Sequence, residues 1–366
     1  MSADLSFSDL FGRVPECRAE APGRVNLMGD HTDYNAGFVF PAAIPQRTEV
    51  ELARSAGKRV RAWSREIGSG VEEFALGAEK RGRGWLDYVQ AVTFVAAAEP
   101  LPIGGFEVRI TSSIPPGSGL SSSAALSVSL LRALRDAFAL PLGDRELAIL
   151  ARRAENEFIG APVGMMDPMA VTFATPDRAM FLDTRDLEFE LVPLPRAAEL
   201  AVVHSGVAHR NETGGYKTRR AECTLAAARL GVETLRELGP EDLPRIDLLE
   251  PPLNRRARHV VTENERVLET VAAFRDERID DAGRAFFESH RSLAEDFEVS
   301  TPEIDAMIDL ARSEPGILGA RITGGGFGGA VVMLARRGEA ARASRAIAAK
   351  YDGLTRKRAA VLVPAT

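Results

Sequence analysis

A run of small residues between a strand pattern and a helix pattern constrains this chain most. The run is Pro115-Pro116-Gly117-Ser118-Gly119-Leu120-Ser121-Ser122-Ser123-Ala124-Ala125. Residues 106–110 before it alternate as a half-buried strand does, and apolar residues recur at helical spacing over 121–138. Glycines let a backbone approach a ligand closely, and the free N–H groups at a helix start favour a phosphate. We expect an anion site here, and a Ser/Gly turn without a ligand is the alternative.

A second cluster of glycines occupies residues 324–329. It fits the letters of a dinucleotide fingerprint, but a strand pattern at 330–334 follows where that fingerprint needs a helix. The first run is not a Walker A loop either, because no Gly-Lys-Ser/Thr follows it. The second cluster is therefore either a tight bend or a loop packed against the first anion site.

Charge and cysteine content exclude several classes of protein. The 366 residues carry 46 Lys and Arg against 52 Asp and Glu, a net charge of −6, so no general attraction to nucleic acid or an anionic membrane follows. Cys17 and Cys223 cannot form a disulfide framework and lack metal-ligand spacing. No signal peptide and no apolar run of about 18 residues is visible. We expect a cytoplasmic protein without nucleic-acid or membrane partners.

The chain is long enough for two domains of about 150 residues each. A charged, proline-containing segment at 183–200 indicates the boundary, and we predict domains at 1–195 and 196–366. Mixed α+β structure is expected. Further predicted elements are a strand at 48–53, a helix at 145–158 with Asp144 as its N-cap, and helices at 217–238, 255–275 and 277–296.

Residues 23–35 concentrate acids, amides and a histidine within a short stretch. Arg24, Asp30, His31 and Asp33 all lie there. Carboxylates accept two O–H bonds each, so such a cluster suits the hydroxyls of a sugar. A solvated turn is the alternative.

A lone acid lies among apolar residues in Gly164-Met165-Met166-Asp167-Pro168. If buried, Asp167 needs a partner such as Arg24, and a poised carboxylate results. A structural acid that caps a helix or pairs with an arginine is the alternative. Upstream, Glu155 is either a metal ligand or part of a solvated helix face.

Taken together, these segments resemble the GHMP kinase superfamily and, within it, the galactokinases, over nearly the whole chain. The resemblance rests on residues 23–34, 115–125, 164–167, 256–264, 289–302 and 323–329. It implies a two-domain GHMP kinase-like α+β fold with the active site between the domains. The N-terminal domain would be ribosomal-S5-like and bind sugar and nucleotide, and the C-terminal GHMP kinase domain would be ferredoxin-like.

The resemblance implies ATP-dependent phosphorylation of galactose at its C1 hydroxyl. Asp167 would act as the general base, and Arg24 would hold it ionised and offset phosphoryl charge. The implied Mg²⁺ ligands are Ser123 and Glu155. The implied sugar contacts are Asp30, His31, Asp33, Gly164 and Tyr216. The implied nucleotide contacts are Gly117, Ser118, Gly119, Leu120, Ser121, Ser122, Trp85 and Tyr88, the two aromatics having core packing as their alternative.

Several positions depart from the family pattern. Galactokinases usually carry Glu where this chain has Asp30, which is shorter by about 1.5 Å. Pro168 replaces a usual Gln, Val163 and Gly164 stand where Cys is common, and Asn35-Ala36-Gly37 replaces Asn-Gly-Gly. These departures leave the sugar open.

The partners that the resemblance implies are a small sugar and ATP; a monomer is expected, and a dimer stays open. The alternatives are a C1 kinase of galacturonate, arabinose or N-acetylgalactosamine, and a sugar/ATP sensor without turnover. The presence of Asp167, Arg24 and the complete 121–125 stretch argues against a sensor.

Overall fold

The chain forms two compact units that interleave along the sequence. The computed structural model describes residues 5–67, 70–115, 117–207 and 212–363, so Pro116 of the first glycine run lies outside the described residues. Unit 1 comprises Met1–Gly23, Gln46–Pro116 and Ser121–Phe173, and unit 2 comprises Arg24–Pro45, Gly117–Leu120 and Ala174–Thr366. Because the units interleave, they do not test the predicted domain boundary between residues 195 and 196, and that boundary stays a prediction.

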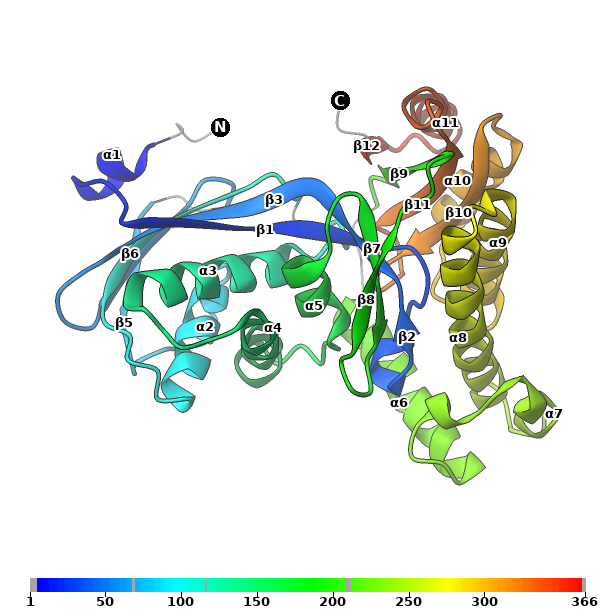
Figure 1. Cartoon of the computed structure of the whole chain (residues 1–366), viewed down its shortest axis with the longest axis horizontal. Coiled ribbons are helices and arrows are strands. Elements are labelled where there is room, and N and C mark those ends of the chain that lie inside the picture. The colour runs from blue at the N-terminus through cyan, green and yellow to red at the C-terminus, as the bar shows by residue number, and fades with distance from the viewer. Residues whose placement is uncertain (1–4, 68–69, 116, 208–211, 364–366) are drawn as a thin grey trace. The chain divides into compact units, whose positions relative to one another are not determined.

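Unit 1 is built on a mixed sheet, visible in Figure 1. β3 pairs antiparallel with β6 and lies beside β1, β6 pairs parallel with β4, and β4 pairs antiparallel with β5. The strands predicted at 48–53 and 106–110 are confirmed. The bounds are β1 Cys17–Asn26, β3 Pro41–Arg54, β4 Arg59–Ser64, β5 Glu72–Ala75 and β6 Phe106–Ser112, and both β1 and β3 continue into unit 2.

The helices α2, α3 and α4 lie on one face of this sheet and pack against one another (Figure 1). The helix predicted at 121–138 is confirmed as α3. The predicted N-cap Asp144 is wrong: Gly143 is the cap, because Asp144 already has helical geometry and the Leu147 N–H bonds to the Gly143 carbonyl. The bounds are α1 Phe7–Phe11, α2 Leu86–Ala98, α3 Ser122–Phe138, α4 Asp144–Arg153 and α5 Met166–Phe173.

The predicted helix 145–158 changes character within its length. α4 ends at Arg153, and the chain continues as η2 (Ala154–Ile159), a π-helical turn. Gly160, with φ +81°, ends this turn. The apolar periodicity continues across the junction, which is why the sequence indicated a single helix.

Unit 2 contains a four-stranded antiparallel sheet in the order β10-β11-β9-β12. In chain order, helices separate β9 from β10, β11 follows directly, and α11 leads into β12. This is the βαββαβ arrangement of a ferredoxin-like domain, so that part of the predicted fold class is confirmed. The bounds are β9 Ala198–His204, β10 Ile317–Thr323, β11 Ala330–Arg336 and β12 Ala360–Val363.

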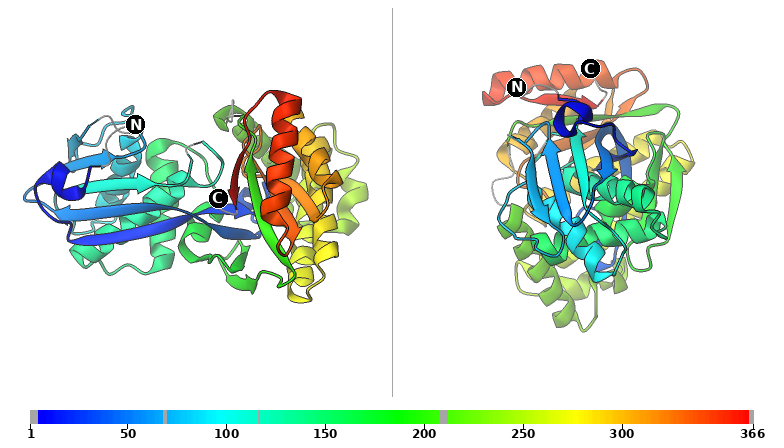
Figure 2. Two further views of the ribbon diagram at one scale, coloured as in Figure 1. Left: turned by 90° about the horizontal axis from the view of Figure 1, so that it is seen from above. Right: turned by 90° about the vertical axis from the view of Figure 1, so that its left-hand side faces the viewer.

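The helices of unit 2 share one core with this sheet, and Figure 2 shows them beside it. Ala201 and Val203 of β9, with Ile322 of β10 and Met333 of β11, face that core. The helix predicted at 217–238 ends early, at Leu230, because Gly231 with φ +73° interrupts it. The bounds are α6 Glu212–Leu230, α8 Leu253–Arg275, α9 Ile279–Glu295, α10 Pro302–Ser313 and α11 Ala340–Thr355.

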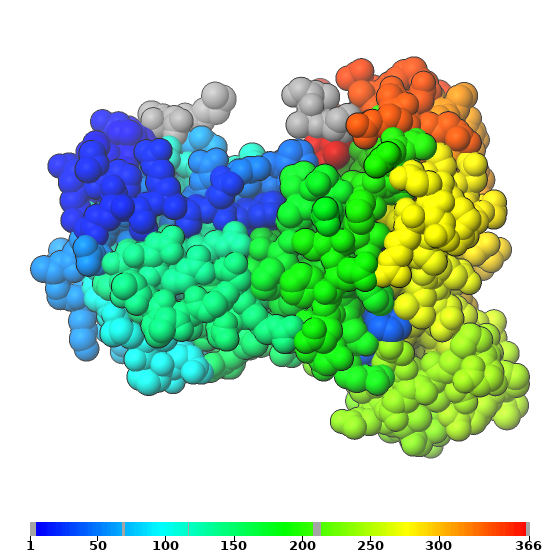
Figure 3. All heavy atoms as spheres, viewed as in Figure 1, coloured from blue at the N-terminus to red at the C-terminus, as the bar shows by residue number. Residues whose placement is uncertain are grey.

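Two smaller parts complete unit 2. The segment between α6 and α8 holds η3 (Leu235–Glu237), η4 (Pro240–Asp242) and α7 (Leu243–Ile246), and forms a lobe next to α8 in Figure 3. β7 (Arg178–Asp183) pairs with β2 (Phe38–Val39) and β8 (Phe189–Pro193). Within the described ranges, none of the helices is long and apolar enough to cross a membrane.

Candidate functional site

In unit 1, the serine run places Ser121 in contact with Asp167. Ser121 is the N-cap of α3 and has a left-handed backbone with φ +60°, which is uncommon for a residue other than glycine. Its Oγ donates a 2.6 Å hydrogen bond to Oδ2 of Asp167, the second residue of α5. The turn therefore ties the start of one helix to the acid at the start of another.

Ser123 and Glu155 form a second contact in the same unit. The Ser123 Oγ donates to the Glu155 Oε2 over 3.2 Å, and Glu155 is 5% exposed. A hydroxyl and a carboxylate are oxygen ligands of the kind that Mg²⁺ takes alongside substrate phosphates and water. In the part of the chain that the structure describes, no group of three His, Cys, Asp or Glu could hold a metal ion. The pair fits an ion that is held largely by phosphate oxygens.

The remaining predicted residues of unit 1 lie on or next to its helices. Gly164 is buried in the connection from η2 to α5, and Pro168 is the third residue of α5. Ser122 starts α3. Trp85 is at the N-cap of α2 and Tyr88 is in its first turn, and both are half-buried. The predicted adenine contact of these two aromatics stays a prediction.

In unit 2, Arg24 holds the first part of the glycine run. Its NH1 donates to the Gly119 carbonyl over 2.6 Å, and its backbone N–H donates to the Leu120 carbonyl over 3.2 Å. Gly117 has φ +66° and Gly119 has φ +73°, while Ser118 is buried. The glycines are needed at these two positions because side chains rarely adopt that conformation.

The second glycine cluster packs against the first. A Cβ added at Gly324, where φ is +84°, would meet the Gly119 carbonyl oxygen at 3.1 Å. A Cβ at Gly325 would lie 3.9 Å from the Tyr216 ring. The cluster packs against the first glycine run, as one interpretation predicted, and positive φ angles at Gly324, Gly326, Gly328 and Gly329 also give it the bend that the other predicted. The strand predicted at 330–334 is confirmed as β11.

The Asp30 carboxylate lies in the interior of unit 2, where it is 1% exposed. Its Oδ1 accepts from the Asn26 side chain at 3.0 Å and from the Gly324 N–H at 3.2 Å. Its Oδ2 pairs with the Arg321 NH2 at 2.7 Å. Burial raises the pKa of Asp30, although Arg321 acts in the opposite direction. The carboxylate therefore joins the acidic segment 23–35 to the second glycine loop.

Arg321 also contacts a second buried acid, which sequence reasoning missed. Its NH2 lies 3.3 Å from the Glu263 Oε1, and Glu263 pairs with Arg266 at 2.8 Å and accepts from Ser289. Burial acts to raise the pKa of Glu263, but Arg266 and Arg321 outweigh it and hold the pKa well below its usual value. We call Asp30, Glu263, Arg266 and Arg321 the buried charge network.

A ring cluster surrounds His31, which has φ +68°. The His31 ring centroid lies 5.6 Å from that of Tyr216 and 4.7 Å from that of Phe297, and its Nδ1 is 3.0 Å from the Tyr34 hydroxyl. Burial, and then the nearby His259, lower the pKa of His31 to about 3, so its ring is neutral near pH 7. Asp33, at the start of η1 (Asp33–Asn35), is half-buried.

The structure thus brings several predicted residues together within each unit. In unit 1 these are Ser121 with Asp167 and Ser123 with Glu155. In unit 2 these are Arg24 with Gly119, and His31 with Tyr216. The only available signals for the missed residues were a charged residue inside an apolar strand pattern, Arg321, and acids within helical segments, such as Glu263.

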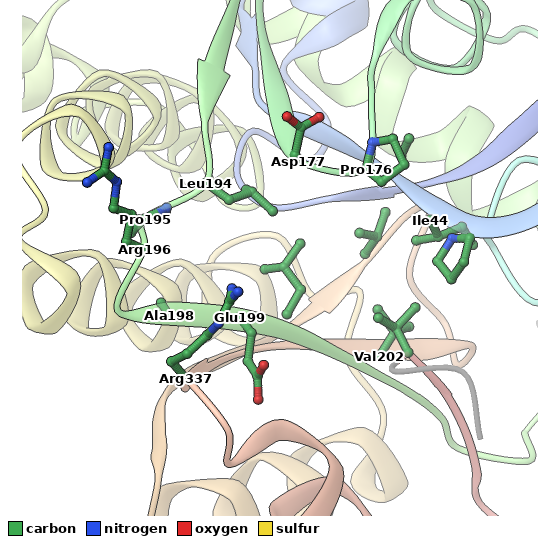
Figure 4. Close-up of a pocket in the computed structure, with 15 residues that line it drawn as sticks. Ile44, Pro176, Asp177, Leu194, Pro195, Arg196, Ala198, Glu199, Val202 and Arg337 are labelled. Atoms are coloured by element: carbon green, nitrogen blue, oxygen red, sulfur yellow. The ribbon is translucent and has the colours of Figure 1, made fainter.

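A pocket of about 590 Å³ lies elsewhere in unit 2 (Figure 4). Its walls are mostly apolar, and none of the predicted site residues lines it. Its two acids already have partners, since Thr175 donates to Asp177 and the Ala340 N–H donates to Glu199. The cavity is therefore separate from the residues discussed above.

Three family models match the chain. They are the galactokinase galactose-binding signature over residues 5–54, the GHMP kinase N-terminal domain over residues 87–175 and the GHMP kinase C-terminal domain over residues 270–353. The three matched ranges together include all of the predicted site residues except Trp85 and Tyr216.

Similar proteins align over most of their length. The galactokinase of Streptomyces coelicolor is 42% identical, covering 90% of this chain and 87% of that protein. The galactokinase of Roseiflexus sp. is 37% identical, covering 98% and 93%. A structure of Lactococcus lactis galactokinase complexed with galactose superposes with a TM-score of 0.92 at 33% identity, over 97% of this chain and 95% of that one. Methanococcus jannaschii mevalonate kinase, at 18% identity and a TM-score of 0.70, shares the fold.

Proposed function

Because this chain belongs to the galactokinase family of the GHMP kinases, we propose that it transfers the γ-phosphoryl group of ATP to the C1 hydroxyl of galactose. The products are galactose 1-phosphate and ADP. The observation that carries the proposal is the 2.6 Å hydrogen bond between Ser121 and Asp167, because it joins the proposed phosphate loop to the proposed base.

Asp167 is the proposed base. It accepts the proton of the C1 hydroxyl as that oxygen attacks the γ-phosphorus atom. The Ser121 hydroxyl donates to Oδ2 and so holds the carboxylate in place. Little covalent chemistry is left to the protein in phosphoryl transfer, so positioning and charge stabilisation account for most of the rate.

Backbone amides are the proposed nucleotide contacts. The N–H groups of Gly117 to Leu120 and of Ser121 and Ser122 bind the phosphates, because α3 leaves its first N–H groups without helical partners. Arg24 is proposed to offset phosphoryl charge while its NH1 supports the Gly119 carbonyl. Trp85 and Tyr88 are proposed to contact the adenine.

We propose that Ser123 and Glu155 hold Mg²⁺ together with phosphate oxygens. Their side chains are 3.2 Å apart and offer a hydroxyl and a carboxylate, which fits this ion. When bound, the ion neutralises phosphate charge and orients the γ-phosphoryl group. Ser122 precedes Ser123 on α3.

The proposed sugar contacts are Asp30, His31, Asp33, Gly164 and Tyr216. The Nδ1 of His31 contacts the Tyr34 hydroxyl at 3.0 Å, so Nε2 is the nitrogen proposed to bond to a sugar hydroxyl, and burial supports the neutral ring by lowering the pKa of His31 to about 3. Asp30 is the weakest member of this set, since Arg321, Asn26 and Gly324 already occupy its carboxylate. Any sugar hydroxyl that reaches Asp30 would add to those contacts.

A panel of sugars tests the proposal. ADP release is measured with galactose, galacturonate, arabinose and N-acetylgalactosamine at saturating ATP and Mg²⁺. The highest kcat/KM is expected with galactose. Turnover only with another sugar would move the assignment to that sugar, and sugar-dependent ATP binding without ADP would indicate a sensor instead of a kinase.

A further inference from the structure

Asn156, a residue to which the proposed mechanism gives no role, holds the backbone just before Gly164 and Asp167. It lies in η2, next to Glu155. Its Oδ1 accepts from the Val163 N–H at 2.9 Å, and its Nδ2 donates to the Val163 carbonyl at 3.3 Å. One side chain therefore contacts both backbone groups of Val163, and the Val163 N–H also donates to the Ala161 carbonyl at 2.9 Å.

The π-helical turn creates this arrangement. The Glu155 carbonyl accepts from the N–H groups of both Gly160 and Ala161, at 2.9 and 3.1 Å, and this closes the wide turn. A π turn holds one residue more than an α turn, so residues beyond it are rotated relative to α4. Glu155 reaches Ser123 while the next side chain, Asn156, reaches Val163.

The backbone that Asn156 holds, at Val163, lies four residues before the proposed base, Asp167. Gly164 follows Val163, and α5 begins at Met166 with Asp167 as its second residue. The Arg152 Nε makes a longer contact, 3.4 Å, to the same Val163 carbonyl. The segment between η2 and α5 is short, so a displacement at Val163 is passed on to Gly164 and to the start of α5.

We propose that Asn156 is a positioning residue: it fixes the positions of Gly164 and Asp167 relative to the bound sugar. The inference rests on the proposed function, because those two residues act there as a sugar contact and the base. Asn156 touches neither substrate and works through the backbone of Val163. A shift of about 1 Å in a reacting group can cost on the order of a hundredfold in rate, so loss of the two Asn156–Val163 hydrogen bonds should lower the rate measurably.

The test uses the full chain and a graded set of variants. Asn156→Ala removes both bonds, Asn156→Asp keeps only the acceptor for the Val163 N–H, and Arg152→Ala removes only the longer contact. Asn254→Ala is the matched control: Asn254 is also a half-buried helical asparagine, but among the described residues its side chain bonds only to the adjacent Arg255 N–H, at 2.8 Å.

We expect Asn156→Ala to lower kcat/KM for the sugar at least about tenfold, with KM for ATP within about twofold of the parent. Asn156→Asp should fall between parent and Ala, and Arg152→Ala should lose less than Asn156→Ala. A kcat/KM for Asn156→Ala equal to that of Asn254→Ala would overturn the proposal. Equal losses toward both substrates with a lowered Tm would also overturn it, since that pattern indicates only general destabilisation.

Amide hydrogen exchange separates this proposal from the proposed function. Asn156→Ala should speed exchange in a peptide spanning residues 160–166, whereas Asn254→Ala should not, whichever sugar the protein accepts. Unchanged exchange in that peptide would overturn the proposal that Asn156 holds the Val163 backbone. If the parent turns over no sugar in the panel, the proposed function fails, and exchange together with sugar binding by calorimetry still decides the role of Asn156.

Discussion

Replacing Arg321 with methionine tests the buried charge network of unit 2. The Arg321 side chain is 0% exposed, and its two acidic partners, Asp30 and Glu263, are 2% and 0% exposed. Methionine fills much of the space of the arginine stem but removes the cation. Glu263 keeps Arg266 as a partner, whereas the Asp30 carboxylate loses its ion pair with Arg321 at 2.7 Å. Removing one partner of a buried pair costs about 3–5 kcal/mol, so we expect a loss of that size in the free energy of unfolding.

Urea unfolding at pH 7 measures this loss, and Arg336→Met is the control. Arg336 pairs with Asp280 at 2.8 Å, but both side chains are more than half exposed, so its loss should cost less than about 1 kcal/mol. Arg321→Lys keeps the charge and should be less damaging than Arg321→Met. If Arg321→Met lowers the free energy of unfolding no more than the Arg336 control does, the reasoning about a paired, buried Asp30 is refuted.

Three further outcomes are expected. Ser121→Ala removes the donor to Asp167 and should lower kcat about 10-fold or more in the ADP-release assay; kcat within twofold of the parent would contradict the contact's role. Gly324→Ala should raise KM for ATP because the new Cβ would lie 3.1 Å from the Gly119 carbonyl oxygen of the proposed phosphate loop, whereas Gly338→Ala, with φ +85° and open space, should not. Burial lowers the pKa of His259 to about 4 from an unfolded value of about 6.5, so the stability it contributes is present above pH 6.5 and is lost as pH falls toward 4. When the pH is lowered from 7 to 5, the free energy of unfolding should therefore fall by about 2 kcal/mol less in His259→Gln than in the parent, and an equal fall in both proteins would contradict this.

The sequence predictions that the structure confirms rest on local patterns. The small-residue run between strand and helix predicted α3 and its N-terminal turn, because a strand period of 2 changes there to a helical period. The strand β11 after the second glycine loop was predictable from the continuous apolar run at 330–334. The ferredoxin-like order of unit 2 came from the family resemblance, since no local pattern fixes which strands pair.

Other features depend on contacts that a sequence pattern does not carry. The π turn η2 leaves the apolar spacing almost unchanged. The sequence pattern therefore did not predict the extra residue in the turn or the contact of Asn156 with Val163. Arg321 lies 291 residues from Asp30, and a charged residue in a strand is usually an exposed one. Asp144 had the residue type of an N-cap, but the backbone gave that position to Gly143.

Product analysis after incubation of the purified protein with galactose, ATP and Mg²⁺ tests the central claim most directly. A phosphorus–proton correlation spectrum should locate the phosphoryl group on the C1 oxygen with the parent, and Asp167→Asn should form no product while still binding both ligands. A phosphoryl group on a different hydroxyl, or product from Asp167→Asn at close to the parent rate, would contradict the account.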